Sequence, residues 1–194
     1  MRYLLPVLLL LLSPALFAQP GGAGLGSFRL GTTTPDSLHT PDFHELETPV
    51  VAGTLALPCD QIRLFKADSL RVEGIWLTDL FLVFHDYRLY RITATYSDAL
   101  RTLFVSQHGL GQRLPERSLS PCSTRPDNRL ILTTNHWQFG KDRALAVQAR
   151  GISARCQPEK TARLTIVRLP IAALTSECDL DFLDPYLDRD AVRQ

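Results

Sequence analysis

A stretch near the middle of the chain constrains the fold most, because two short runs there alternate along the sequence with the period of a β-strand. In residues 80–85, apolar side chains fall on both alternating sets, which predicts a central strand with both faces buried. In residues 90–96, apolar side chains alternate with Arg91, Thr93 and another threonine, which predicts a strand with one face toward water. The polar residues 86–88 separate the two runs, so we expect an antiparallel pair.

The alternation of apolar and polar residues changes phase just before this pair. The apolar positions of 70–72 and of 75–77 differ by one residue, and a β-bulge at Gly74 would restore a continuous strand.

We also expect three aromatic side chains in the core: Trp76, Trp137 and Phe139.

An amphipathic helix is predicted directly after the pair, over residues 98–108. Ser97 has the side chain of an N-cap, because its hydroxyl accepts a hydrogen bond from a free amide of the first turn. Leu100 and Phe104 lie on one helical face, and Gly109 is placed to end the helix. We expect this helix to cover the sheet.

Shorter elements are predicted on both sides of this stretch. Proline-rich residues 112–128 predict a long loop, and residues 169–190 predict one or two short helices. Additional strands are predicted at 28–30, 62–65, 130–133, 136–139, 144–151 and 162–168. We therefore expect an α+β fold of two layers, in which helices pack on one face of an antiparallel sheet of about six or seven strands.

The first residues have the layout of a secretory signal peptide. Residues 1–18 contain an early arginine, an apolar run and a small residue at the end, and we expect cleavage after Ala18. The run is short for a membrane span and no cysteine follows it to carry a lipid, so we expect a mature chain without a transmembrane helix. Glycine-rich residues 19–27 predict a flexible linker, and residues 28–194 predict one domain.

The charge of the mature chain is balanced. Without Arg2, the chain has 20 basic and 20 acidic side chains. A nucleic-acid surface needs a concentrated positive field, so we expect no nucleic-acid partner.

All four cysteines follow the signal peptide. An even number of cysteines in an exported chain predicts two disulfides. Three pairings are possible, and we favour Cys122 with Cys156 and Cys59 with Cys178. The first would join neighbouring loops, and the second would hold the C-terminal segment. The spacing lacks the C-x-x-C pattern of a zinc site.

A cluster of possible metal ligands lies at residues 39–47. His39, Asp42 and His44, with two nearby glutamates, are side chains that zinc or iron accepts. Their spacing fits neither one helical face nor one strand face, so only a loop would bring them together. A solvated loop is the simpler interpretation, and we expect no cofactor.

Two further candidates have simple structural alternatives. Ser106 and His108 suggest a nucleophile and a base, but they are two residues apart on a predicted helix and point apart. Five aspartates suggest calcium but lack the glycine and glutamate of a calcium loop. These are Asp179, Asp181, Asp184, Asp188 and Asp190.

Several motifs resemble those of small exported bacterial proteins whose activity is not assigned. They are F-R-L-G-T from Phe28, V-F-H-D-Y-R-L-Y-R-I from Val83, the helix ending in H-G-L-G, a W-x-F strand and T-A-R-L-T-I from Thr161. This resemblance implies export and an α+β fold and transfers no functional residue. The first motif is also similar to outer-membrane assembly lipoproteins of the BamE type, whose lipid-bearing cysteine is missing here.

Two hypotheses for function follow. The first is a non-enzymatic binding module of the bacterial envelope, periplasmic or secreted, with an envelope or extracellular protein as its partner. The second is an extracytoplasmic hydrolase, with or without a metal, whose best candidate residues are His39 and His44. An exposed apolar patch on the sheet would favour the first hypothesis, and convergence of the two histidines in a cleft would favour the second.

Overall fold

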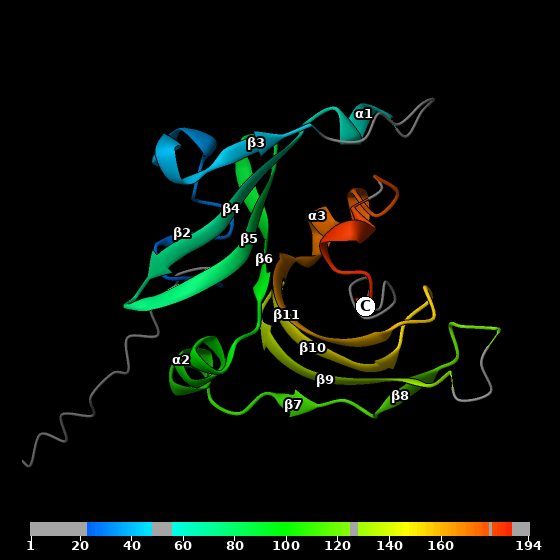
Figure 1. Ribbon diagram of the computed structural model, residues 1–194. Helices are drawn as coiled ribbons and strands as arrows, with labels where there is room; N and C mark the ends of the chain where they lie inside the picture. Colours follow the sequence, from blue (N-terminus) through cyan, green and yellow to red (C-terminus); the bar gives the residue numbers. More distant parts are fainter. Residues whose placement is uncertain (1–22, 48–55, 125–127, 179, 188–194) are drawn as a thin grey trace, which may run out of the picture.

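The structure is a computed structural model that describes residues 23–47, 56–124, 128–178 and 180–187 (Figure 1). It is a mostly β protein, so the expected α+β fold with a helical layer on one face is wrong. A nine-stranded antiparallel sheet and a separate two-stranded hairpin contain most of the regular structure, and the three α-helices are short. The predicted signal peptide lies outside the described residues.

The large sheet has the strand order β3-β4-β5-β6-β11-β10-β9-β7, and β8 also pairs with β9. Its strands are β3 (His44–Leu46), β4 (Ile62–Val72), β5 (Ile75–His85), β6 (Arg88–Thr95), β7 (Gln112–Arg113), β8 (Arg117–Leu119), β9 (Leu130–Phe139), β10 (Asp142–Ile152) and β11 (Pro158–Arg168). The antiparallel pairing of β6 with β11 joins the first half of the chain to the second.

The sheet is strongly curved, so its two faces differ. Figure 1 shows α3 (Leu169–Leu174) and the described end of the chain inside the curve. We call this side the inner face. The other side, where α2 (Asp98–His108) and the N-terminal residues pack, is the outer face. The outer-face core is the larger and includes Leu80, Leu82, Phe84 and Trp137. The inner-face core contains Leu64, Val83, Val167 and Leu183.

Tight hairpins connect the long strands. β4 and β5 are joined by Glu73 and Gly74, which both have positive φ, 49° and 85°. Positive φ at both central residues is the requirement of a type I′ hairpin, and glycine meets it without strain. The expected bulge at Gly74 is therefore wrong, since the phase change marks the end of one strand and the start of the next. The pairing of β5 with β6 through Asp86 and Tyr87 is confirmed.

The predicted helix is confirmed at both ends. Ser97 accepts a hydrogen bond from the Leu100 amide at 3.2 Å, and Gly109 ends the helix with a φ of 74°. Leu100 and Phe104 are completely buried against the outer face. However, α2 is a single eleven-residue helix that packs against β5 and against Trp137 of β9, and it does not form a layer.

The N-terminal residues of the domain are packed, not flexible. Gly24–Leu25 (β1) pairs with Phe28–Arg29 (β2), and the side chain of Leu25 is buried in the outer-face core. The buried Asp142 carboxylate accepts from the Ala23 amide at 3.2 Å and from Arg168 Nε at 2.9 Å. Our expectation of a linker over 19–27 is thus wrong for residues 23–27. The Leu30 amide also donates to the Ala23 carbonyl at 3.0 Å.

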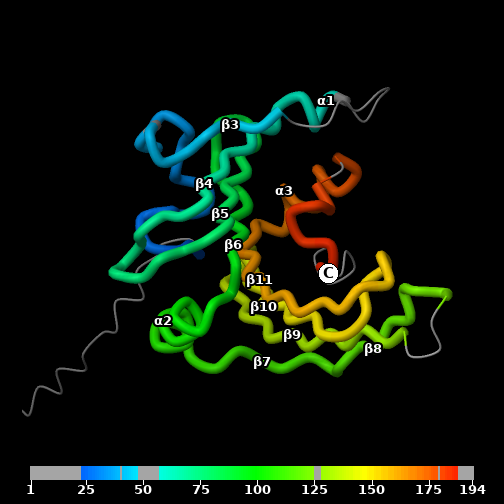
Figure 2. Tube along the Cα trace, viewed as in Figure 1, coloured from blue at the N-terminus to red at the C-terminus, as the bar shows by residue number. Residues whose placement is uncertain are grey.

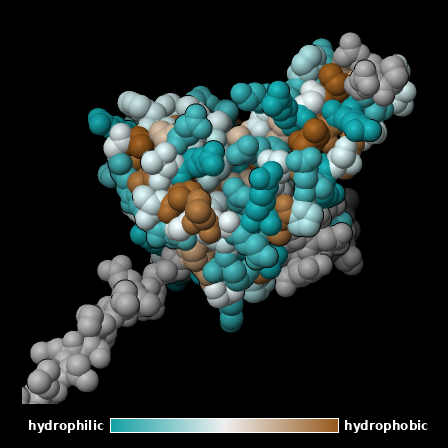
Figure 3. Space-filling model, turned by 90° about the horizontal axis from the view of Figure 1, so that it is seen from below, coloured by the Kyte–Doolittle hydropathy of each residue, from teal (hydrophilic) through white to brown (hydrophobic). Residues whose placement is uncertain are grey.

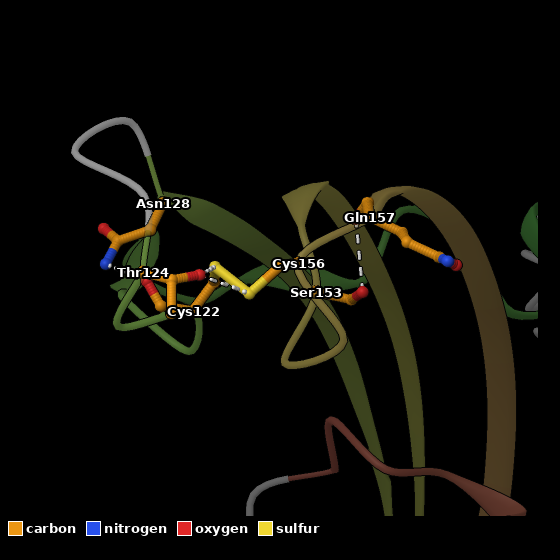
Figure 4. The surroundings of a disulfide bond; sticks show 6 residues. All are labelled: Cys122, Thr124, Asn128, Ser153, Cys156 and Gln157. Carbon is orange, nitrogen blue, oxygen red and sulfur yellow. Dashed lines mark hydrogen bonds between the residues drawn. A yellow bond between two sulfur atoms is a disulfide. The ribbon is translucent and has the colours of Figure 1, made fainter.

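Both favoured disulfides are confirmed. Cys59 at the end of α1 (Ala56–Cys59) bonds to Cys178, which follows α3, and Figure 2 shows these two segments close together. Cys122 bonds to Cys156 and so ties the segment after β8 to the turn between β10 and β11 (Figure 4). The Thr124 hydroxyl lies 3.4 Å and 3.3 Å from the two sulfurs. Two intramolecular disulfides indicate an oxidising, extracytoplasmic environment.

The second half of the sheet is more regular than expected. The two predicted strands at 130–133 and 136–139 form one continuous strand, β9, and the predicted loop at 112–128 contributes the short strands β7 and β8 to its edge. Trp137 is buried as predicted and its indole donates to the Gly109 carbonyl at 2.9 Å. In contrast, Trp76 is 63% exposed, so its assignment to the core is wrong.

Replacing Ser97 with alanine tests the helix N-cap. Ser97→Ala removes the acceptor of the Leu100 amide, so we expect the free energy of unfolding to fall by about 1 kcal/mol in urea denaturation. Ser106→Ala is the control, because Ser106 is exposed near the end of the same helix and bonds only to a carbonyl of that helix. Equal stability of wild type and Ser97→Ala would contradict the capping role.

Candidate functional site

A small cavity lies between the inner face of the sheet and the segment that follows it. We call residues 169–187 the C-terminal segment. The cavity has a volume of about 60 Å³. Its lining combines apolar side chains with a cation, two carboxylates and three hydroxyls: Tyr90, Arg91, Val167, Ala172, Thr175, Ser176, Leu180, Asp181, Asp184 and Leu187.

A β-bulge in β6 places two of these side chains in the cavity. The register between β5 and β6 shifts between Val83 and Phe84, which leaves Tyr90 as the extra residue. A bulge re-aims the side chains next to it, and here consecutive residues Tyr90 and Arg91 both reach the inner side. Tyr90 is buried and its hydroxyl lies 3.1 Å from the Thr175 hydroxyl of the C-terminal segment.

Arg91 begins a chain of hydrogen bonds along the inner face. Its Nε donates to Thr93 Oγ1 at 3.3 Å, and Thr93 Oγ1 lies 3.2 Å from Thr165 Oγ1 on the neighbouring strand β11. Thr165 Oγ1 in turn donates to Asp184 Oδ2 at 2.9 Å. Because the Thr165 hydrogen is used toward Asp184, Thr93 must be the donor between the two threonines. We call this chain the threonine relay.

The cation at one end of the threonine relay has unused hydrogen-bond donors. Arg91 is half-buried, and among the described residues its one hydrogen bond is the one to Thr93. No described carboxylate forms an ion pair with it, although Asp184 and Asp181 are near enough to act on its pKa. Burial lowers the pKa of Arg91, but a guanidinium stays charged at neutral pH.

The carboxylate at the other end has an unused acceptor. Asp184 is 3% exposed, and its Oδ1 has no hydrogen-bond partner among the described residues. Burial raises the pKa of Asp184, and this rise is opposed by Arg91, the Thr165 hydroxyl, Arg163 and the Tyr186 backbone amide. A buried oxygen without a donor costs free energy, so this atom is a candidate contact for a ligand.

More cations lie on the inner face beside the cavity. Arg163 on β11 stacks 5.5 Å from the centre of the Phe81 ring, and Lys66 Nζ lies 5.7 Å from the same ring. Lys66 also forms an ion pair with Asp68 at 2.6 Å. Arg163 Nε is buried without a partner among the described residues. These side chains do not line the cavity itself.

The candidate metal ligands are not brought together. His39 and Asp42 line a hollow of about 570 Å³ on the outer face, between the N-terminal residues and the end of β4. His44 does not line this hollow; it lies on edge strand β3, opposite Lys66. In the described part of the chain, no group of three or more His, Cys, Asp or Glu side chains could hold a metal ion. The hollow is larger than the inner cavity, but its polar side chains are exposed and water can satisfy them.

The remaining sequence candidates have ordinary surroundings. The Ser106 hydroxyl donates to the Leu103 carbonyl, and the His108 ring packs 4.5 Å from Phe104 and 5.0 Å from Phe139. Burial lowers the pKa of His108. Of the five aspartates, Asp184 is buried and Asp181 is exposed, and the other three lie outside the described residues.

The surface carries no obvious apolar patch for a partner protein on the face that Figure 3 displays. That face, the underside of Figure 1, is mainly hydrophilic with separate hydrophobic spots. Large apolar side chains that are exposed lie on several different elements: Leu57, Trp76, Tyr87, Leu110, Ile131, Leu174 and Phe182.

Sequence reasoning missed Arg91 and Asp184 as a site. The alternation in β6 predicted that Arg91 and Thr93 face water, but Thr93 is completely buried beneath the C-terminal segment.

No helix in the described part of the chain is long and apolar enough to cross a membrane. Comparisons with protein-family models, curated proteins and solved structures found no match to this chain.

Replacing Asp184 with asparagine tests its burial. An acid whose pKa is raised on folding keeps its proton in the folded state while the unfolded state has lost it. The free energy of unfolding therefore falls as pH rises from the ordinary aspartate pKa of 3.8 to the higher pKa of Asp184 in the folded protein. Chemical denaturation from pH 3.5 to 7 should show the stability of Asp184→Asn increasing relative to wild type.

Asp60→Asn is the control for this series, because Asp60 is an exposed carboxylate in the turn after α1. A stability difference between Asp184→Asn and wild type that does not change with pH would contradict the raised pKa.

Proposed function

We propose that this protein is a non-enzymatic, extracytoplasmic binding module that holds a small polar ligand in the inner cavity. One observation carries the proposal. Arg91 and Asp184 line the same cavity, and each has hydrogen-bonding atoms that no described residue uses. Polar groups that converge in a concave site with hydrogen-bonding atoms left over are typical of ligand pockets.

The rigidity of the surroundings supports a binding role. The inner wall consists of paired strands β6 and β11, and the threonine relay fixes the orientation of both end groups. The Cys59–Cys178 disulfide and the Tyr90–Thr175 hydrogen bond hold the opposite wall, the C-terminal segment. A preformed site loses less entropy when it binds a ligand. Periplasm or extracellular medium would both suit this role.

Loss of the Arg91 charge should weaken ligand binding. We expect a screen of amino acids, sugars, dicarboxylates and phosphates against residues 19–194, with both disulfides formed, to yield compounds that raise the melting temperature. Arg91→Gln should weaken such a ligand at least about tenfold, since it removes a charge-assisted hydrogen bond. Arg88→Gln is the control, because Arg88 is an exposed arginine on the same strand.

The same samples distinguish binding from catalysis. Mass spectrometry after incubation should recover the ligand unchanged. Binding that is equally strong in Arg91→Gln and wild type, or conversion of the ligand to a product, would contradict the proposal.

A further inference from the structure

The donor and acceptor left free in the cavity differ in charge, and this difference points to a class of ligand. We propose that the cavity binds the head group of an α-amino acid, with its carboxylate on the Arg91 guanidinium and its ammonium group on Asp184 Oδ1. This inference rests on the proposed function and narrows it to one ligand chemistry.

The threonine relay separates the two charged groups, which form no direct ion pair. It connects Arg91 to Asp184 through two hydroxyl groups on neighbouring strands, so that Nε and Oδ2 point into the relay. The guanidinium nitrogens beyond Nε and the carboxylate oxygen Oδ1 remain for other partners. A ligand that carries one positive and one negative group offers a partner of opposite charge to each end of the relay.

Formal charge makes a zwitterion a better match than a neutral ligand. A sugar hydroxyl can donate to Asp184 and accept from Arg91, but it brings no opposite charge to either group. The ammonium and carboxylate of a zwitterion add Coulomb attraction to each of these hydrogen bonds, which a neutral hydroxyl lacks. A simple anion would satisfy Arg91 and add repulsion against Asp184 and Asp181, which also lines the cavity.

The dimensions of the cavity favour a small head group. One water molecule needs a cavity volume of about 10–15 Å³, and an engineered cavity of about 150 Å³ accommodates benzene. The volume of about 60 Å³ therefore suits an ammonium and a carboxylate on one carbon, not an aromatic ring. Val167, Ala172 and Leu180 supply apolar walls for a short side chain. The ligand is either a free small amino acid or the amino-acid end of a larger molecule.

Isothermal titration calorimetry with blocked derivatives tests this assignment. The protein is residues 19–194 with both disulfides formed, and the titrants are L-alanine, N-acetyl-L-alanine and L-alaninamide. N-acetylation removes the ammonium group and amidation removes the carboxylate. We expect alanine to bind and each derivative to bind at least about tenfold more weakly.

Variants assign each charge of the ligand to a residue. Asp184→Asn should weaken alanine at least about tenfold but should not weaken N-acetylalanine, because that derivative has no ammonium group and its carboxylate is repelled by Asp184. Arg91→Gln removes both the positive charge and the planar pair of donors. Arg91→Lys removes only the planar pair, so the two variants together show which property the ligand needs. Asp60→Asn and Arg88→Gln are the exposed controls, and circular dichroism checks the fold of every variant.

The outcomes separate this inference from the function on which it rests. A blocked derivative that binds as tightly as alanine, or a sugar that binds in an Arg91-dependent manner while alanine does not, overturns the zwitterion assignment and leaves the binding function standing. If no compound of the wider screen binds, alanine included, both fail. A longer molecule ending in an amino acid that binds more tightly than alanine would support the inference and identify the larger source.

Discussion

The threonine relay is the interaction on which the inner side of the molecule depends. Thr93 and Thr165 are completely buried on paired strands β6 and β11, where the two halves of the sheet meet. Buried hydroxyls cost free energy unless they are hydrogen-bonded, and these two satisfy each other and the groups at either end. The relay therefore links the central strands, the C-terminal segment and the candidate site in one network.

Covalent and apolar contacts hold the C-terminal segment over this network. The Cys59–Cys178 disulfide closes a loop with a sequence separation of 119 residues, which strongly restricts the unfolded chain. Leu180 and Leu183 pack in the inner-face core, and the segment has little regular structure of its own. Its position is thus set by tertiary contacts and not by helix propensity. The cavity exists only because this segment stays in place.

Features with local causes were predictable from the sequence. The hairpin between β5 and β6 follows from alternation and turn residues, and the ends of α2 follow from Ser97 and Gly109. The disulfide pairing was one of three and was chosen because it joins neighbouring loops and holds the C-terminal end. Each of these depends on residues close in sequence or on a short list of alternatives.

Features that depend on distant residues were not predictable. The helices looked sufficient for a layer, but α2 shares the outer face with the N-terminal residues, and the C-terminal segment covers the inner face. Arg91 and Thr93 have the pattern of a solvent-facing strand, because nothing local reveals that residues 169–187 fold over them. The histidines near residue 40 formed a cluster in sequence, whereas Arg91 and Asp184 form one in space.

The protonation of Asp184 in the intact protein is the most direct test, because the account requires a buried carboxylate with one oxygen free for a ligand. Carboxyl ¹³C NMR can follow this side chain as pH changes, with and without alanine. The account predicts that Asp184 titrates above the ordinary range in the free protein and that alanine lowers its pKa. Titration in the ordinary range, unchanged by alanine, would contradict it.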